Sequence, residues 1–466
     1  MISSAQTLAI AILGCALGAC AFKQYAPQPL VPEDIEADFA ARSARAPELR
    51  DYMQAHGLES GDWPLQRWGL PELTLLAFYY HPELRQAAAR AQIARAQEQS
   101  AGQPLNPGLR IGPEYHSFIE RGSPWSLGFA LSIPFETMNK RGLRGEQAAY
   151  LAQAAALDVG AVAWKLRNQV RSRFIDNFVA REELALLQTE TEARERQTKL
   201  LDKRLGLGMI SAFEAGVARR QAADGKLRAL RKKGEVSLAL SRLAEAVALP
   251  DASLQDMTLS FAGLDRALAA EASALKREAL THRLDMRRLL LEYAAAETAL
   301  KLEIARQYPD FEFTPGYAWD QSDNVWSLAV GLLVPVLNRN QGPIAEAEAR
   351  RAAKAQDFAA LQNQTIAATE QAALKYRNAL AELAAAGNLQ RAMQRQRDRI
   401  TRQFDAGNAD RLDTVTAELQ VLEAGRAILQ ARAATLAALG ELEDVLQRPL
   451  FGAFLLPEFG TAKDAH

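Results

Sequence analysis

The chain has 466 residues, enough for two or three ordinary domains, and a formal net charge of −1. Charged residues make up 24% of the sequence, with acidic and basic side chains interspersed and no polybasic or acidic tract, so nothing in it points to nucleic acid. The five histidines are nowhere paired at metal-ligand spacing, and the chain lacks a Walker loop, an HExxH motif, a nucleophile elbow and a CxxC motif. We therefore predict no enzymatic activity, no metal site and no cofactor.

Residues 1–19 form an apolar run that is too short for a good membrane span and that ends in small residues, as a secretion signal does. The run closes on Leu-Gly-Ala followed by Cys20, which is similar to a bacterial lipobox, in which the cysteine is acylated and becomes the mature N-terminus. One departure is that no Lys or Arg precedes the apolar run. We expect a lipid anchor on Cys20; the alternative is a signal peptide without lipidation.

A stretch near residues 106–142 occurs a second time near residues 308–342. Trp125 and Pro134, for example, recur 201 residues later. Each copy contains two runs in which apolar residues alternate with small or polar ones, the pattern of a β-strand with one apolar face. The four strands are expected at about 108–118, 125–135, 310–320 and 326–336.

Two interpretations of these strands are possible. They could form a half-buried hairpin of a soluble domain, or membrane-barrel hairpins, since about 9–11 tilted residues cross a bilayer. In the barrel, aromatic residues at the strand ends would lie at the membrane interfaces: Tyr115, Trp125, Phe135, Tyr317, Trp319 and Trp326. The candidate lumen-facing residues are Arg110, Glu114, His116, Glu312 and Asp320.

Two proline-free stretches, 135–249 and 344–448, are rich in Ala, Leu, Glu, Arg and Gln, which favour helices. Each contains a glycine break, near 206–211 and near 406–410, that divides it into two long helices. A helix before the second break would extend about 90 Å, too long for globular packing, so it should lie along partner helices as a coiled coil. Shorter helices are expected before each strand pair, from Pro71 to Gly102 and from Asp265 to Gln307.

The two glycine breaks also align, because Gly208 and Gln221 recur 199 residues later as Gly407 and Gln420. The chain therefore contains two copies of one unit, each of which reads helix, strand, strand, very long helix, turn, long helix. The predicted organisation is a signal peptide at 1–19, an N-terminal extension at 20–70, a first repeat at 71–264, a second repeat at 265–449 and a tail at 450–466.

Four strands in one chain cannot close a membrane barrel, because the smallest such barrels have about eight strands. An open sheet in lipid would leave unpaired N–H and C=O groups at its edges. Three chains with cyclic symmetry supply about twelve strands and remove every edge. The predicted fold is therefore mainly α with a membrane β component. Antiparallel helical coiled coils form a tunnel that continues a trimeric barrel, with an internal twofold repeat.

With these residues in view, the chain resembles the TolC family of outer-membrane factors over about 71–449. The most specific stretches are WSLAVGLLVPVLNRNQGPIAEAEARR and PFETMNKRGLRGEQAA, where the second strand runs through Pro into the long helix. HPELRQAAARAQ is similar to the branch that includes heavy-metal efflux factors. The resemblance implies a homotrimer in the outer membrane, docked to a periplasmic membrane-fusion adaptor and to an inner-membrane pump of the RND type. Lipidated members are common in this family, consistent with Cys20.

The resemblance also implies that acidic residues after the tip glycine form a ring at the periplasmic aperture. The candidate tip residues are Gly208, Glu214, Gly407, Asp410 and Asp413. The family pattern falls on Asp413 and its repeat counterpart Glu214, whereas a second acidic position of some members falls on Thr416, so only part of the ring is present. The alternative role for both carboxylates is to cap or solvate the helix that follows. The two glycines mark turns that need a positive φ.

Two functional hypotheses follow. In the first, the protein is a passive export duct that opens by untwisting of its tip helices when an adaptor binds. In the second, it is a lipid-anchored periplasmic coiled-coil scaffold without a channel. The two differ in one test, because Cys20→Ser would release a scaffold into the soluble periplasm and would leave a barrel in the membrane.

Overall fold

The computed structural model describes residues 23–58, 63–118, 122–264, 277, 279–320 and 323–450. The expected signal segment with Cys20, and the tail beyond residue 450, lie outside these residues. The chain divides into two compact units, Met1–Arg42 and Ser43–His466. In the first unit, helix α2 (Pro32–Ala41) begins on a proline and has no buried side chain. All the other described helices and strands belong to the second unit.

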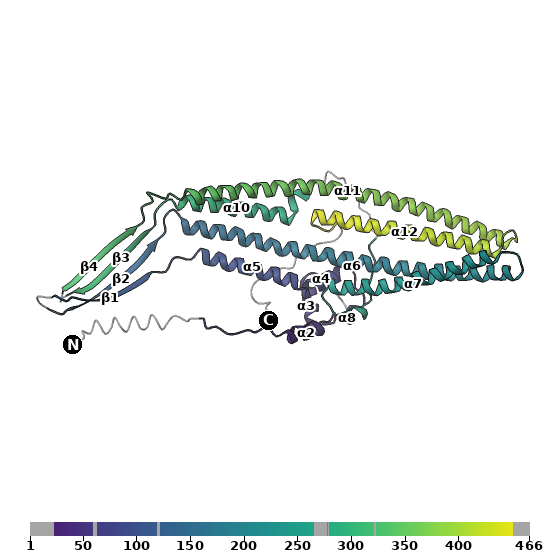
Figure 1. Ribbon diagram of the computed structural model, residues 1–466, viewed down its shortest axis with the longest axis horizontal. Coiled ribbons are helices and arrows are strands. Elements are labelled where there is room, and N and C mark those ends of the chain that lie inside the picture. Colours follow the sequence, from purple (N-terminus) through teal and green to yellow (C-terminus); the bar gives the residue numbers. More distant parts are fainter. Residues whose placement is uncertain are drawn as a thin grey trace. The chain divides into compact units, whose positions relative to one another are not determined.

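Two antiparallel helix pairs dominate the second unit (Figure 1). The first pair is α6 (Lys140–Gly206) with α7 (Ala212–Ala246), and the second is α11 (Gln341–Asp405) with α12 (Arg411–Leu446). The 65 residues of α11 extend about 100 Å. Helix α12 also packs on α6, which joins the two pairs. Within the described residues, no helix combines the length and the apolar character needed to cross a bilayer.

Small residues line the seam between α6 and α7. Ala215, Ala218 and Ala222 of α7 are buried and recur at intervals of three or four residues, which places them on one helix face. A Cβ added at Gly225, the next member of this series, would lie 3.2 Å from the Thr191 hydroxyl oxygen of α6. The absence of larger side chains on this face lets the two backbones approach closely.

The shorter helices are α3 (Pro47–Ala55), α4 (Leu70–Tyr80), α5 (Pro82–Ala101), α8 (Asp251–Gln255) and α10 (Leu284–Ala305). The prediction of a single helix from Pro71 to Gly102 is wrong, because the helix is interrupted at His81. His81 is extended (ψ 127°) since the proline that follows disfavours a helical conformation before it. Its Nδ1 accepts a hydrogen bond from the Glu83 backbone N–H (3.3 Å) and caps α5. The expected start of the later helix at Asp265 lies outside the described residues.

The largest apolar core lies where α3, α4 and α5 pack against α6 and the end of α7. Its most buried large side chains are Leu49, Met53, Leu73, Leu76, Leu84, Leu166, Phe174, Leu243, Leu249 and Leu254. Trp68, 2% exposed, joins this core and forms a short parallel bridge. Its N–H donates to the Thr258 carbonyl and its carbonyl accepts from the Ser260 N–H, both at 2.9 Å. The segment before α4 is thereby fixed to the segment after α8.

The strands are β1 (Gly108–Tyr115), β2 (Trp125–Phe135), β3 (Phe311–Asp320) and β4 (Asp323–Leu332). They form one antiparallel sheet in the order β1-β2-β3-β4. The last strand begins and ends earlier than the expected 326–336, because Asp323 pairs with Asp320 and Leu332 pairs with Phe311, the two ends of β3. The mainly helical architecture with four antiparallel strands confirms the predicted fold class at the level of one chain.

The order of the strands matches the order of the helices that adjoin them. Helix α5 leads into β1, β2 leads into α6, α10 leads into β3, and β4 leads into α11. The helices pack in the same sequence, α5 on α6, α6 on α10 and α10 on α11. The sheet lies at the end of the long helices where α6 and α11 begin, and the two tips lie at the other end (Figure 1). The outer members of the sheet are therefore β1 and β4. The helices that adjoin them, α5 and α11, are the outer members of the helix series.

Candidate functional site

The sheet exposes a continuous apolar face. Residues directly opposite each other in an antiparallel sheet lie on the same face, and the register pairs Leu109 with Leu131, Ile111 with Phe129, and Phe313 with Val330. Large side chains of this face remain exposed in the single chain, for example Phe129 at 40% and Leu328 at 69%. A soluble hairpin would bury this face on a core, whereas the described helices of the second unit lie beyond the end of the sheet and do not cover it (Figure 1).

The six aromatic residues expected at membrane interfaces all belong to this apolar face. Five gather toward the end of the sheet remote from the helices: Tyr115, Trp125, Tyr317, Trp319 and Trp326. Within this group, Tyr115 contacts Trp125 edge-on with ring centroids 5.0 Å apart, and Tyr317 contacts Trp326 at 4.8 Å. Phe135 lies at the opposite end, against Phe313 at 5.1 Å. The aromatic residues thus mark both ends of the apolar face.

The opposite face carries the five candidate lumen residues. Arg110 lies across from Ala130, and Glu114 lies across from Ser126. Glu312 pairs with Pro134 and Gly331 and accepts a hydrogen bond from the Ser132 hydroxyl.

His116 follows β1, and its Nε2 lies 3.2 Å from the Ser126 hydroxyl and 3.1 Å from Asp320 Oδ1. Small and polar side chains alternate with the apolar ones throughout, so this face is the one suited to water.

The connection between strands and helices contains a buried lysine that the sequence did not single out. Lys140, 5% exposed, donates from Nζ to the Tyr308 carbonyl and to Asp310 Oδ1, both at 2.7 Å. The Thr137 N–H also donates to Asp310 Oδ1 (2.8 Å). Burial raises the pKa of Asp310, but the bonds from Lys140 and Thr137 outweigh it and hold the pKa below its ordinary value. The β2–α6 connection is thereby tied to the α10–β3 connection.

The two tips, residues 207–211 (first tip) and 406–410 (second tip), have the same backbone. Gly208 has φ +72° and Gly407 has φ +77°, the left-handed conformation that ends a helix. In the first tip, the N–H groups of Gly208 and Met209 donate to carbonyls of the last turn of α6, both at 2.9 Å. In the second tip, Gly407 and Asn408 do the same at 2.9 and 2.8 Å. The glycine positions are therefore set by backbone geometry.

The candidate acidic residues cap the helices that follow the tips. The Ser211 N–H donates to Glu214 Oε2 (2.9 Å), and the Glu214 N–H donates back to the Ser211 hydroxyl (3.2 Å). Asp410 and Asp413 form the same reciprocal box at the start of α12, with both bonds at 3.0 Å. Glu214 and Asp413 are exposed, so each caps a helix and still presents its carboxylate to solvent. The Thr416 hydroxyl donates to the Leu412 carbonyl (2.8 Å).

Asp410 has a further role, because it also pairs with Arg204 at the end of α6. Partial burial raises the pKa of Asp410. The N–H of Asp413, the Arg204 guanidinium and the N–H of Leu412 together outweigh that effect and hold the pKa below its ordinary value. Arg204 thus links the first tip to the start of α12.

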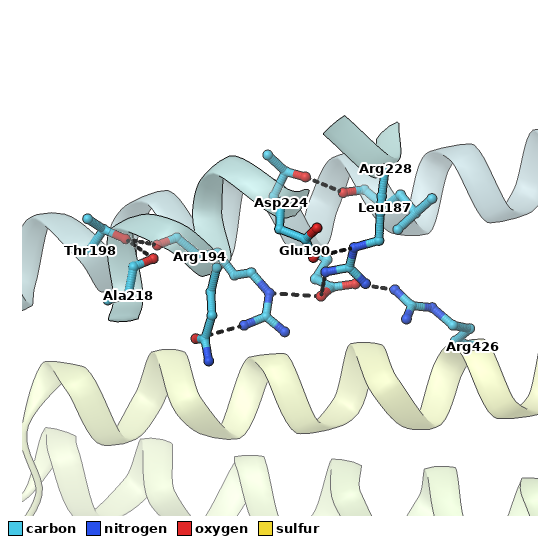
Figure 2. A network of polar contacts seen from close by, with 10 residues as sticks. Leu187, Glu190, Arg194, Thr198, Ala218, Asp224, Arg228 and Arg426 are labelled. Atoms are coloured by element: carbon cyan, nitrogen blue, oxygen red, sulfur yellow. Dashed lines mark hydrogen bonds and ion pairs between the residues drawn. The ribbon is translucent and has the colours of Figure 1, made fainter. Parts of the chain in front are cut away.

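Further from the tips, an ionic cluster joins three helices (Figure 2). Glu190 of α6 is 8% exposed and is surrounded by Arg194 of α6, Arg228 of α7 and Arg426 of α12. Arg194 Nε donates to Glu190 Oε1 at 2.8 Å, and Arg228 also pairs with Asp224 (3.1 Å). Burial raises the pKa of Glu190, but the three guanidinium groups outweigh it and hold the pKa below its ordinary value.

The sequence patterns do not single out the Glu190 cluster. Two of the three partners of Glu190, Arg228 and Arg426, lie far from it in the sequence. Arg196 and Glu418 are also distant in sequence, with two contacts at 2.6 and 2.7 Å. These pairs follow from the packing of α6 on α7 and α12, which no local sequence pattern indicates.

A family model described as outer membrane efflux protein matches residues 76–249 and 275–446. The cobalt-zinc-cadmium resistance protein CzcC of Cupriavidus metallidurans is 27% identical over 341 residues, 71% of this chain and 78% of that protein. The crystal structure of the outer membrane protein VceC from Vibrio cholerae is similar with a TM-score of 0.67 and 18% identity, over 82% of this chain and 97% of VceC. The structure of CusC is similar with a TM-score of 0.67 and 16% identity, over 92% and 99% of the two chains.

Proposed function

Since the chain belongs to the outer membrane efflux protein family, we propose that three copies form one continuous duct through the outer membrane and across the periplasm. The family membership confirms the resemblance drawn from the sequence and gives the protein its function, that of an outer-membrane efflux channel. The trimer, the lipid anchor and the individual site residues belong to the proposal. One observation carries it: a four-stranded sheet with an exposed apolar face and two edges that no other described strand pairs with.

The two outer edges of the chain support closure into a ring. Strand β1 and helix α5 lie on one side, and strand β4 and helix α11 lie on the other. A second copy can pair its β1 with β4 and its α5 with α11 at the same boundary, and three such boundaries close the sheet and the helical wall together. Closure removes the unpaired N–H and C=O groups that an open sheet would expose to lipid.

In this ring the apolar face contacts lipid and the polar face lines the lumen. Tyr115, Trp125, Tyr317, Trp319 and Trp326 would lie at one membrane interface and Phe135 at the other, where aromatic rings are favoured. Arg110, Glu114, His116, Glu312 and Asp320 would line the water-filled path. Passive conduction through this path requires no catalytic residue of the chain.

The tips are proposed as the periplasmic aperture and the docking surface for an adaptor. The first tip exposes Leu207 (75%), Met209 (66%) and, at the start of α7, Phe213 (79%). Exposed apolar side chains of this size gathered at one place favour a protein partner. Asp413 and Glu214 would ring the opening, and a periplasmic membrane-fusion adaptor with an inner-membrane pump of the RND type would complete the assembly.

A lipid on Cys20 would add a second attachment to the outer membrane. The competing scaffold hypothesis makes the lipid the only attachment. We expect Cys20→Ser to remain in the outer-membrane fraction, because the barrel holds it there. Recovery of this variant in the soluble periplasm would support the scaffold and contradict the duct.

Divalent metal ions are the proposed cargo, supported by the likeness to CzcC, which is named for cobalt, zinc and cadmium resistance. A duct carries what its pump supplies, so the cargo is tested in cells and not on the isolated chain. Deletion of the gene should lower the tolerated concentration of these ions, and a tolerance unchanged for all three would contradict the proposal.

The decisive experiment measures the mass of the full-length protein in detergent and its conductance in planar bilayers. We expect a trimer with a small, cation-sensitive conductance, because acidic carboxylates ring the aperture. Asp413→Asn should reduce the sensitivity to cations, with the exposed Glu346→Gln of α11, far from the tip, as the matched control. A monomer without conductance would contradict the duct.

A further inference from the structure

The ionic cluster around Glu190 has an apolar counterpart elsewhere in the chain. The shift of 199 residues that relates the two tips gives each of its residues an image in the other repeat. The images of Glu190, Arg194, Arg228 and Arg426 are Leu389, Met393, Ala427 and Leu227. All four charged side chains are thus replaced by apolar ones.

The shift of 199 residues also relates the ends of the helices in the structure. Helices α6 and α11 end at Gly206 and Asp405, and helices α7 and α12 begin at Ala212 and Arg411, each pair 199 residues apart. The same shift relates buried residues far along α7 and α12: Ala218 with Ala417, Ala239 with Ala438, and Leu243 with Leu442. The images therefore occupy equivalent places on equivalent helices.

Within one chain, equivalent positions of the two repeats pack against different helices. Helix α12 packs on both α11 and α6, whereas its image α7 packs on α6 and the short α8. The difference is visible in burial, because Leu429 of α12 is 7% exposed and its image Leu230 of α7 is 68% exposed. Leu227 and Leu389 are 45% and 46% exposed. One face of α7 and one face of α11 are therefore left uncovered by the described chain.

We propose that Leu227 and Leu230 of one copy pack against Leu389 and Met393 of a second copy. This inference rests on the trimer proposed above. In such a ring, α11 of one copy meets α7 of the next as α6 meets α12 within a chain. The boundary between copies then repeats the boundary within the chain, with apolar contacts in place of ion pairs.

The chemistry of the two boundaries suits how each forms. The Glu190 cluster is buried when the chain folds, and its four members find their partners in the same molecule. The face of α7 must be solvent-exposed until a second copy arrives. Burying Arg and Glu at that later step would require removing water from both charges, whereas burying leucines releases water and favours association. The apolar boundary is therefore the one suited to assembly.

The proposal is tested with the full-length Leu227→Cys/Leu389→Cys variant in detergent under mild oxidation. A disulfide needs Cβ atoms about 3.5–4.5 Å apart, so facing positions should link neighbouring copies. We expect a covalent trimer on a non-reducing gel that returns to a monomer with reductant. The two single variants control for links through the native Cys15 and Cys20.

The matched control is Leu227→Cys/Leu374→Cys. Leu374 is also an exposed leucine of α11, 50% exposed, but it lies about 22 Å along the helix from Leu389. We expect no covalent trimer from this pair. Equal linking of both pairs, or linking of neither, would overturn the proposed seam.

The same samples are analysed for mass, which separates two kinds of failure. A trimer that does not link through positions 227 and 389 would overturn the seam and leave the proposed channel intact. A monomer would overturn both.

A second measurement uses charges. Leu389→Glu should make the trimer dissociate more easily, and adding Leu227→Arg should restore it by recreating the Glu190–Arg426 arrangement between copies. If the two substitutions weaken the trimer independently, the residues do not touch.

Discussion

The two tips show how one backbone can carry two surfaces. Both end a long helix on a glycine with positive φ, both satisfy the last carbonyls with the same pair of hydrogen bonds, and both open the next helix with a capping box. The first tip exposes Leu207 and Met209, and the equivalent positions of the second tip are Ala406 and Asn408. The duplication has preserved the turn and changed its outer side chains. Backbone geometry and surface chemistry are therefore separable here.

The largest effect on resistance is expected from the difference between the exposed side chains of the two tips. Changing Leu207, Met209 and Phe213 to serine should nearly abolish efflux-dependent resistance in cells, because each large apolar side chain contributes about 1.5–3 kcal/mol when fully buried by a partner. Resistance and the amount of trimer are measured together. The control changes Ala406, Asn408 and Ala409 of the second tip to serine. Equal losses of resistance from the two sets would contradict an apolar docking surface on the first tip alone.

The shared backbone predicts equal effects at the two glycines. Gly208→Ala and Gly407→Ala should each destabilise their tip by about 1–2 kcal/mol, the cost of a left-handed conformation for a residue with a Cβ. Hydrogen exchange of the Met209 and Asn408 amides measures the loss. Gly216→Ala, inside α7 where no atom lies within 4 Å of the new Cβ, is the control. It should stabilise the helix by about 0.8–1.0 kcal/mol.

The N-caps of α7 and α12 should differ in their contribution to stability by one interaction. Ser211→Ala and Asp410→Ala each remove an N-cap worth about 1 kcal/mol, but Asp410→Ala also removes the pair with Arg204. That exposed pair adds at most about 1 kcal/mol. Asp410→Asn retains a good N-cap and removes only the charge, so it should isolate the pair. Hydrogen exchange in the first turns of α7 and α12 distinguishes the two contributions, and a larger effect for Ser211→Ala would be inconsistent with this structure.

The smallest effect is a pH dependence confined to the second tip. The pKa of Asp410 is lowered in the folded protein, so its contribution to stability is fully present above the unfolded pKa and is lost as pH falls through the folded one. Exchange at the start of α12 should therefore be unaffected by this group between pH 7 and 5 and should increase only below about pH 4. Asp410→Ser, which copies the first tip, should remove that contribution to the acid response. An unchanged response would assign it to other carboxylates.

Much of this architecture was predictable from local signals. The strand alternation and the glycine breaks each depend on residues close in sequence, and the recurrence of both patterns identifies the repeat. Gly208 and Gly407 could be assigned because a positive φ favours glycine whatever lies nearby. The break at His81 was missed in the helix expected from Pro71, although Pro82 was the local signal for it.

The rest depended on which helices meet. Lys140 reads as an ordinary basic residue after a strand, and only the approach of the α10–β3 connection makes it a buried partner of Asp310. Glu190 and Arg426 are 236 residues apart, and their pairing follows from α12 packing on α6. Their images Leu389 and Leu227 are 46% and 45% exposed in the described chain. The sequence by itself determined two equivalent repeats, because alternation, helix propensity and turn geometry are local properties. Only the tertiary structure decided that equivalent positions face different surroundings, because burial and ion pairing depend on residues brought together from distant parts of the chain.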